Sequence, residues 1–449
     1  MYIGYGILFA VYFFAGGHGM ATKFIVRGGK PLYGEISISG MKNAALPILF
    51  ATVLVGGVCT LNNIPVVSDI TMSLDVLHQM GARISHCKNG TLRIDTTHIN
   101  QGSSPAELVK QMRGSTYLLG AELGRFGKAD VGHPGGCDFG TRPLDQHMKG
   151  FEALGATVEN GGGYIRLTAP DGLHGNSVYF DVASVGATVN VILASVFAEG
   201  TTVIDNAARE PHIVDLANFL NSCGANITGA GTPMIKVRGV TELHGCDYTI
   251  IPDMIEAGTY MAAAAAAGGC VRINSIIPKH IETITAKLCE MGVCVEEYDD
   301  YVVVKSAEEL RNVNIKTLPY PGFPTDMHPQ FAPLLCMAGG VSCIQEGIWE
   351  NRFRYVDELC KMGANIRVDG RTATYTGGEK LKGAPVDAMD LRAGAALVIA
   401  GLAAEGVTEI GGVQYIKRGY DDIVGKLQAL GADIEEVTVR EQETVKKAN

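Results

Sequence analysis

The sequence repeats itself about every seventy residues, and this periodicity restricts the possible folds more than any other feature. An apolar or cysteine residue followed by Gly-Ala or Gly-Val recurs six times, with the glycine at Gly81, Gly155, Gly224, Gly292, Gly363 and Gly431. A small-residue turn that ends an apolar stretch recurs in the same order, at Gly57, Gly127, Gly200, Gly269, Gly340 and Gly406. Because the two markers agree, we interpret the chain as six copies of one structural unit.

Each copy is expected to contain a strand, a buried helix, a strand, a covering helix, a strand and a closing strand. For example, residues 259–267 are almost wholly apolar, which predicts a helix that is buried on all sides. Residues 281–291 have an amphipathic pattern, which predicts a helix that covers a sheet with its polar side in solvent. Short strands are predicted at 271–274, 293–297 and 301–304. The predicted fold class is therefore α/β, with six βαβαββ-like repeats.

Six units are too many for one core, so we expect two domains of three units each. The chain is predicted to cross between them near Gly40 and again near Pro252. The first barrel domain would comprise residues 42–251, and the second would combine residues 20–41 with residues 252–449. The cleft between two domains is the default place for a ligand.

Residues 1–19 are expected to form an extension that is not part of the fold. Tyr2 to Gly17 are apolar and aromatic, carry no Lys or Arg, and are too few to span a bilayer comfortably. A targeting or membrane role is the alternative, but a natural start at Met20 is favoured. The next residues, 23–26, begin a plausible strand.

The charge and the cysteines exclude several classes of protein. The chain carries 37 basic and 47 acidic residues, a formal net charge of −10, so nothing suggests a nucleic-acid or membrane partner. Its 11 cysteines are odd in number and include no C-x-x-C pair, which favours reduced thiols in a cytoplasmic protein over disulfides or a zinc site. We therefore predict no metal and no cofactor, and the oligomeric state is left open.

The predicted buried helices begin with polar residues. These residues are Lys42 and Asn43, Arg113, Ser184 to Gly186, Asp253 with Glu256, Asp326, and Asp390 with Arg392. A buried helix has little reason to start with charge unless its start faces solvent or a ligand, where its free N–H groups attract anions. The pair Asp253 and Glu256 is at least equally consistent with a capping box, and Asp390 with a simple N-cap.

A glycine-rich segment holds the most reactive cysteine that the sequence offers. Cys137 lies in residues 132–145, a stretch with four glycines, which predicts a mobile loop with an exposed thiol. Arg142 and the nearby helix starts would lower the pKa of this thiol and prepare it for proton transfer or attack.

Eight motifs, in order, resemble those of the UDP-N-acetylglucosamine 1-carboxyvinyltransferase family, and the resemblance runs from about Lys23 to Ile434. The motifs lie at residues 39–47, 134–145, 184–188, 206–211, 323–327, 350–353, 390–393 and 417–420. The resemblance implies two inside-out α/β barrels of three repeats each. It also implies transfer of the enolpyruvyl group of phosphoenolpyruvate to the 3-hydroxyl of UDP-N-acetylglucosamine with release of phosphate. This is the first committed step of peptidoglycan synthesis, and hence of cell wall biogenesis, cell shape and division.

The resemblance also implies roles for individual residues. Phosphoenolpyruvate would be held by Lys42, Asn43, Arg142, Arg392 and Arg418. Cys137 would protonate the methylene carbon and can form a covalent pyruvate-derived adduct, and we expect it to be the thiol that fosfomycin modifies. Asp326 would act as the base beside the sugar hydroxyl or orient it. The UDP-sugar contacts implied are Arg113, Arg142, Pro143, Leu144, Asp145, Gln146, Ser184, Val185, Gly186, Asp326 and Ile348. Glu210 and Arg352 match cleft positions, though each could instead form an inter-domain ion pair.

Five positions depart from the family pattern: Ser68, Tyr117, Val182, Met254 and Lys417. Ser68 and Val182 stand where lysines are expected, so substrate affinity could be lower, but no departure removes an atom that the chemistry needs. Two alternatives stay open. One is the related carboxyvinyltransferase of the shikimate pathway, which has no counterpart to the Cys137 loop. The other is a catalytically silent paralogue that binds UDP-sugar and regulates partners.

Overall fold

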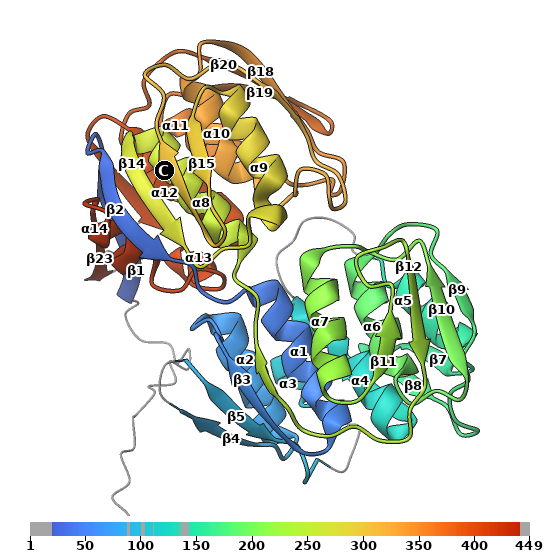
Figure 1. Cartoon of the computed structure of the whole chain (residues 1–449). Coiled ribbons are helices and arrows are strands. Elements are labelled where there is room, and N and C mark those ends of the chain that lie inside the picture. The colour runs from blue at the N-terminus through green and yellow to red at the C-terminus, as the bar shows by residue number, and fades with distance from the viewer. Residues whose placement is uncertain are drawn as a thin grey trace, which may run out of the picture.

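The computed structural model describes residues 20–440 apart from 88–89, 100–103, 111, 134 and 136–142. Figure 1 shows two lobes that are joined by two segments of chain, one ahead of α1 (Lys42–Val55) and one ahead of α8 (Met254–Ala267). The two segments run side by side, because Gly40 forms an isolated β-bridge with Pro252. The chain therefore enters each lobe at the start of a buried helix, which is α1 in one lobe and α8 in the other.

The first lobe packs three sheets around three central helices. The central helices are α1, α4 (Tyr117–Phe126) and α6 (Val185–Ser195), and the further helix of each unit is α2 (Ser68–Gln79), α5 (Asp145–Ala153) or α7 (Pro211–Ser222). The strand orders are β13-β3-β5-β4, β6-β8-β7 and β11-β12-β10-β9. The strands are β3 (Val58–Asn62), β4 (Arg83–His86), β5 (Leu92–Asp95), β6 (Lys128–Gly132), β7 (Thr157–Gly161), β8 (Tyr164–Thr168), β9 (Ser177–Tyr179), β10 (Thr201–Asp205), β11 (Asn226–Thr228), β12 (Met234–Arg238) and β13 (Asp247–Thr249).

The second lobe repeats this plan with the C-terminal half of the chain and the first two strands. Its central helices are α8, α10 (His328–Met337) and α12 (Leu391–Ala403), and its other helices are α9 (Pro278–Glu290), α11 (Val356–Lys361), α13 (Val413–Ile416) and α14 (Ile423–Ala429). The strand orders are β15-β16-β14-β2, β17-β18-β20-β19 and β21-β22-β1-β23. The strands are β1 (Met20–Arg27), β2 (Leu32–Ser37), β14 (Gly269–Asn274), β15 (Cys294–Glu297), β16 (Tyr301–Lys305), β17 (Asn314–Lys316), β18 (Gly340–Gln345), β19 (Asn365–Asp369), β20 (Thr372–Gly377), β21 (Pro385–Asp387), β22 (Val407–Gly411) and β23 (Asp433–Arg440). β1 pairs antiparallel with β22 and β23, and β2 pairs parallel with β14.

The predicted α/β fold with a repeated unit is confirmed. The central helix α8 is buried from Met254 through Ala266, whereas α9 buries only Ile281, Ile284 and Leu288. The unit around α4 differs, because the described residues ahead of it form the short helices α3 (Ala106–Val109) and η1 (Arg113–Thr116) instead of a strand. There the buried Ser115 hydroxyl donates to the Val109 and Met112 carbonyls, which closes a turn in place of strand pairing.

The first repeat marker has a backbone cause. Its six glycines all have positive φ, between 91° and 107°, and each follows the second helix of its unit. A residue that ends a helix in the left-handed region avoids strain only without a Cβ, so glycine recurs at this point of every unit. Among the described residues, no helix is long and apolar enough to cross a membrane.

Candidate active site

Lys42 and Arg418, which come from different lobes, bind the same carboxylate. Lys42 is the first residue of α1, and its Nζ lies 3.1 Å from Asp69 Oδ2. Arg418, which follows α13, donates from Nε to Asp69 Oδ1 at 2.9 Å. Burial would raise the pKa of Asp69, but the two cations outweigh it and lower that pKa. Asp69, in the first turn of α2, therefore stays ionised and holds both cations at one point between the lobes.

A second cluster surrounds Asp326, just ahead of α10. Arg352 Nη2 lies 2.8 Å from Asp326 Oδ1, and Arg392 Nε lies 3.3 Å from Oδ2. The side chains of Arg352 and Arg392 are only 3% and 2% exposed, whereas that of Asp326 is 27% exposed, so the carboxylate is the part that solvent reaches. Burial alone would raise the pKa of Asp326, but Arg392 and Arg352 hold it well below its ordinary range.

The two clusters act on one another and together attract anions. The charge of Lys42 also lowers the pKa of Asp326, which places Lys42 within electrostatic reach of the second cluster. Four cations minus two carboxylates leave a net charge of +2, in a chain whose formal charge is −10. Arg392 Nη1 is buried and has no hydrogen-bond partner among the described residues. An unsatisfied guanidinium donor beside a net positive charge is suited to a carboxylate or phosphate ligand.

Three segments predicted to contact the UDP-sugar converge on His147. Ser184 caps α6, accepting from the backbone N–H of Ala187 at 3.3 Å, and a Cβ built on Gly186 would lie 2.9 Å from the His147 ring. Asn190 lies 2.9 Å from His147 Nδ1. Burial and the charge of Arg113 lower the pKa of His147 to about 3, so the ring is neutral.

The start of α5 is fixed to the strand end ahead of α6. Gln146 donates from Nε2 to Asp145 at 2.8 Å and to Asp181 at 3.2 Å, while its Oε1 accepts from the Asp181 backbone at 3.0 Å. Pro143 and Leu144 directly precede this helix and Val185 begins α6, so these predicted contacts belong to the same region.

Other predicted residues are held by buried acids. The backbone N–H of Ile348 donates to Glu346 Oε1 at 2.7 Å, and Thr325, next to Asp326, donates to Glu346 Oε2 at 3.0 Å. Glu210 accepts from the backbone N–H of Tyr320 at 3.4 Å, a contact between the lobes that is not an ion pair. Asn43 is half-buried in the first turn of α1.

Asp253 and Asp390, for which the sequence left a capping role open, both cap helices. Asp253 accepts from the backbone N–H groups of Ile255 and Glu256 at the start of α8, and Asp390 does the same for Arg392 and Ala393 at the start of α12. Glu256 does not complete a capping box, because its carboxylate accepts from Lys426 at 2.5 Å and from the Ser39 backbone at 2.8 Å.

Cys137 and Arg142, the centre of the predicted reactive loop, lie outside the described residues. The flanking residues are described on both sides, from Lys128 to His133 and again from Pro143 onward. The roles proposed for Cys137 and Arg142 therefore rest on the sequence.

Of the five departures, only Ser68 and Lys417 adjoin a charged cluster, since they directly precede Asp69 and Arg418. Ser68 donates its backbone N–H to Lys417 O at 3.1 Å, and the Lys417 side chain pairs with Glu436. Val182 is 67% exposed beside the Ser184 cap, and Tyr117 is half-buried at the start of α4. None of these residues takes a partner from Lys42, Asp326 or Arg418 in the hydrogen bonds and ion pairs of the described residues.

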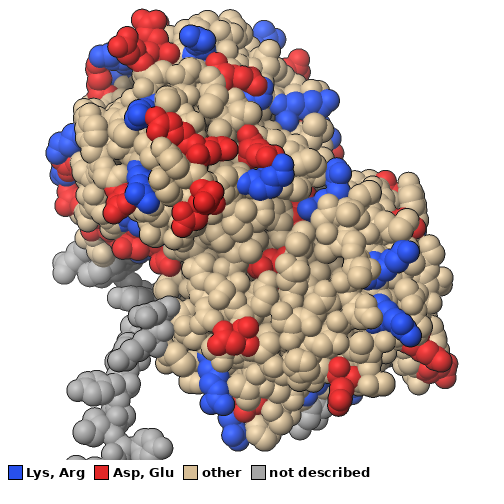
Figure 2. Space-filling model, viewed as in Figure 1, with Lys and Arg blue, Asp and Glu red and all other residues tan. Residues whose placement is uncertain are grey.

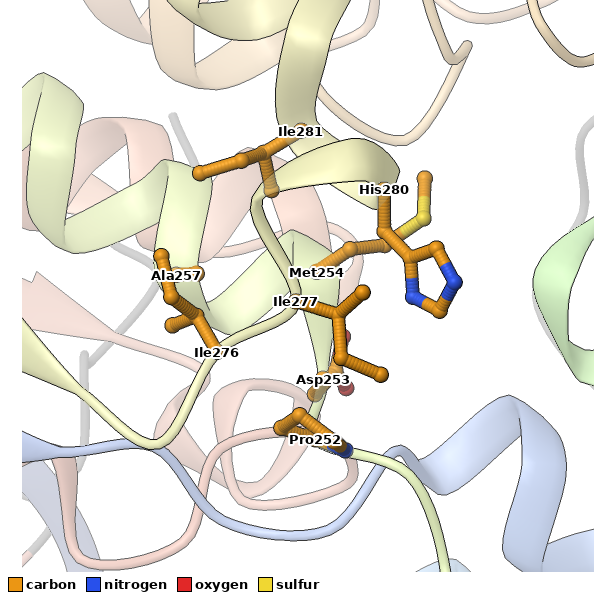
Figure 3. A pocket seen from close by; sticks show the side chains of 8 residues that line it. All are labelled: Pro252, Asp253, Met254, Ala257, Ile276, Ile277, His280 and Ile281. Carbon is orange, nitrogen blue, oxygen red and sulfur yellow. The ribbon is translucent and has the colours of Figure 1, made fainter. Parts of the chain in front are cut away.

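Met254 lines a small hollow at the start of α8 that is distinct from the charged clusters. It leaves essentially no room for even a water molecule, and Figure 3 shows Ile276, Ile277 and Ile281 around it with Met254 and His280 side by side. A hollow of this size is below the usual range for a site that holds a drug-sized ligand.

On the surface seen in Figure 2, acidic and basic side chains are intermixed on the second lobe, the upper one in this view, so this face of the lobe carries no large patch of one sign.

Comparisons with known proteins agree with this geometry. The family model for EPSP synthase (3-phosphoshikimate 1-carboxyvinyltransferase) matches residues 26–427. The enolpyruvyl transferase NikO from Streptomyces tendae is 27% identical, with a TM-score of 0.85 over 94% of this chain and 100% of that one. EPSP synthase from Acinetobacter baumannii is 19% identical, with a TM-score of 0.71 over 93% of this chain and 100% of that one, which shows a shared fold. The fold class is that of the enolpyruvyl transferases.

Curated relatives are more specific. UDP-N-acetylglucosamine 1-carboxyvinyltransferase from Clostridium botulinum is 57% identical over 92% of this chain and 99% of its own length. UDP-N-acetylglucosamine 1-carboxyvinyltransferase 3 from Caldanaerobacter subterraneus is 55% identical over 93% of this chain and 100% of its own length. The chain belongs to the UDP-N-acetylglucosamine 1-carboxyvinyltransferase family, as the sequence motifs predicted.

Sequence reasoning missed two residues that organise the site. Asp69 joins Lys42 to Arg418, and its only sequence signal is an acid in the first turn of an amphipathic helix, which also fits a favourable interaction with the helix dipole. His147 lies one residue after the predicted Gln146, and nothing in the sequence distinguishes it from any other histidine on a helix.

Proposed function

We propose that this protein transfers the enolpyruvyl group of phosphoenolpyruvate to the 3-hydroxyl of UDP-N-acetylglucosamine and releases phosphate, at the start of peptidoglycan synthesis. The observation that carries the proposal is the convergence of Lys42 and Arg418, from two lobes, on Asp69. Membership of a family whose relatives are named for this reaction supports the substrates. We further propose that residues 42–251 and residues 20–41 with 252–449 act as two domains in a cytoplasmic enzyme.

The phosphate of phosphoenolpyruvate would bind where Lys42 and Arg418 meet, with Asn43 and Arg142 completing its shell. Lys42 has three N–H donors, of which one contacts Asp69, so the ammonium can bind a phosphate without leaving that carboxylate. The substrate carboxylate would bind Arg392, whose buried Nη1 lacks a partner among the described residues. Cations that are already in place bind an anion without the cost of being ordered first.

Asp326 would take the proton of the sugar 3-hydroxyl as that oxygen attacks C2 of phosphoenolpyruvate. In the ligand-free arrangement Arg352 and Arg392 make Asp326 a weak base, because they hold its pKa low. Sharing Arg392 with the substrate carboxylate would weaken that hold and raise the pKa. The base would therefore strengthen when the second substrate is present, which couples proton removal to a filled site.

Cys137 would donate its proton to the C3 methylene carbon, which completes the addition and gives a tetrahedral ketal. Loss of a proton from C3 and departure of phosphate then regenerate the enol ether on the sugar. The positive charge around Lys42 and Arg418 would stabilise the phosphate as it leaves. We also propose Cys137 as the target of fosfomycin, with modification of the intact protein at this residue as the test.

The UDP-sugar would contact four separate parts of the chain, which are Arg113, residues 143–146, Ser184 to Gly186, and Ile348. The neutral His147 ring is hydrogen-bonded to Asn190 and packs against the first turn of α6. The Ser184 hydroxyl oxygen accepts from the Ala187 backbone N–H at 3.3 Å, a long hydrogen bond that leaves the hydroxyl able to donate to a ligand.

Release of inorganic phosphate tests this proposal. We expect release that requires both phosphoenolpyruvate and UDP-N-acetylglucosamine and that a Cys137→Ala variant reduces strongly. No release above that variant would favour the silent regulatory paralogue. Release with shikimate 3-phosphate in place of the UDP-sugar would favour the related carboxyvinyltransferase.

A further inference from the structure

Three cysteines from distant parts of the sequence meet inside the first lobe. Cys59 lies in β3, Cys223 caps the C-terminal end of α7, and Cys246 directly precedes β13. Their Sγ atoms all lie within 4.8 Å of one another, and Cys223 Sγ lies 3.3 Å from Cys246 Sγ. Cys59 and Cys223 are buried, and Cys246 is half-buried.

The backbone around the three thiols is fixed by hydrogen bonds. Thr60 N–H donates to Cys246 O at 2.8 Å, where β3 and β13 pair in parallel. His244 N–H donates to Cys223 O at 2.8 Å, which ties the segment ahead of β13 to the end of α7. The sulfurs are therefore presented by three elements that already contact one another.

The spacing of the sulfurs fits one bound cation. Zinc binds thiolate at about 2.3 Å, so two sulfurs of a tetrahedral zinc site lie about 3.8 Å apart. Cys223 Sγ and Cys246 Sγ are 3.3 Å apart and no pair exceeds 4.8 Å, so small shifts of the side chains would bring the sulfurs to that spacing. A disulfide would instead need the sulfurs to approach to about 2.05 Å and would leave the third thiol over.

Metal binds cysteine as the thiolate, so a cation bound at this cluster would displace the thiol protons.

His244 is the candidate for a fourth ligand. Its ring lies beside Gly224, since a Cβ built there would lie 3.3 Å from His244 Nε2. Its Nδ1 lies 3.2 Å from Gly245 O, and its ring nitrogens lie outside the 4.8 Å grouping of the three sulfurs. His244 is exposed, and to bind the same ion its side chain would have to turn toward the thiols.

We propose that Cys59, Cys223, Cys246 and His244 form a structural zinc site in the first lobe. Cysteine spacing in the sequence pointed away from zinc, because the ligands lie 164 and 23 residues apart (223 − 59 and 246 − 223) and match no short motif. The site is separate from the transfer chemistry, since it joins the C-terminal end of α7 to β3 and β13, whereas Lys42 begins α1 and Asp326 lies just ahead of α10.

Zinc content tests the proposal. A Cys137→Ala protein, which removes the reactive loop thiol, is expected to retain one zinc per chain after gel filtration in reducing buffer. Adding Cys223→Ala is expected to abolish this zinc, and adding Cys343→Ala, a half-buried cysteine outside the cluster, is expected to preserve it. His244→Ala should lower zinc affinity at least tenfold. Equal affinity in His244→Ala would overturn its role as ligand.

A second measurement does not depend on the folding of a variant. Cobalt substituted into the Cys137→Ala protein should give visible bands of a tetrahedral site and sulfur-to-metal charge-transfer absorption. Removing the zinc from the unmodified protein with a chelator should lower its melting temperature and leave its phosphate release unchanged. Absence of charge transfer, zinc that persists in Cys223→Ala, or a Cys223–Cys246 disulfide with no metal uptake after reduction would overturn the proposal.

Discussion

Replacing Asp69 with asparagine removes the charge that joins Lys42 to Arg418 and keeps the side-chain volume. The side chains of Asp69, Lys42 and Arg418 are 6%, 9% and 19% exposed, so two poorly solvated cations lose their shared partner. Removing one member of a buried ion pair costs about 3–5 kcal/mol. Because asparagine keeps one hydrogen-bond acceptor, we expect the lower end, about 3 kcal/mol, or a fall of about 6–12 °C in the melting temperature of a lobe of this size.

The dependence on phosphate separates an anion site from a purely structural ion pair. Without the Asp69 charge, the two cations should bind inorganic phosphate more tightly, and a ligand at a hundredfold excess over its Kd stabilises by about 2.7 kcal/mol. Scanning calorimetry should therefore show a larger phosphate-dependent rise in melting temperature for Asp69→Asn than for the unmodified protein. Asp433→Asn is the matched control, since Asp433 also contacts two cations, Arg27 and Lys30, but on the surface. Its loss should cost much less stability than that of Asp69, because solvent screens exposed ion pairs.

The pH dependence gives the same experiment a second result. The pKa of Asp69 is lowered in the fold, so its contribution to stability is present above the unfolded value of about 3.9 and is lost as the pH falls below it. This acid-dependent loss should be smaller in Asp69→Asn. Equal phosphate shifts in the variant and the unmodified protein, or a loss of stability no greater than that of Asp433→Asn, would refute the reasoning.

Three further substitutions test other parts of the site and the core. Arg352→Gln removes one of the two guanidinium groups on Asp326, so the pKa of Asp326 should rise. The acidic limb of the pH profile of phosphate release should then move to higher pH. An unmoved limb would argue against Asp326 as the base. Gly186→Ala should raise KM for the UDP-sugar about tenfold, or about 1.4 kcal/mol, with little change in kcat, because its Cβ would press on His147; an unchanged KM would remove this segment from the sugar site. Glu122 is fully buried, neither carboxyl oxygen has a partner among the described residues, and burial raises its pKa to about 8. Stability should therefore fall between about pH 4.3 and 8 by at most about 1.4 kcal/mol per pH unit, and chemical denaturation of Glu122→Leu should lack this slope.

The repeated unit could be predicted because its signals are local. An apolar helix, an amphipathic helix and a glycine with positive φ each depend on neighbouring residues, and all six glycines of the first marker adopt that conformation. The unit around α4 escaped prediction, since the hydroxyl of Ser115 closes a turn that no periodic pattern reports.

The site could be predicted only in part. Lys42, Asp326 and Arg392 were found because charges at the starts of buried helices need a reason. Asp69, the partner of Lys42, was not found, because its role depends on Arg418, which is 349 residues away and meets it only when the two lobes pack together. The three clustered cysteines were missed for the same reason, since a shared location leaves no mark on spacing along the chain.

A double-mutant cycle on Lys42 and Arg418 addresses the proposed phosphate site most directly, with kcat/KM for phosphoenolpyruvate as the measured quantity. If both cations bind one phosphate, Lys42→Ala and Arg418→Ala should together cost less than the sum of their separate effects, with a coupling energy above about 0.5 kcal/mol. Strictly additive losses would mean that the two cations act on different groups, and the site described here would be wrong.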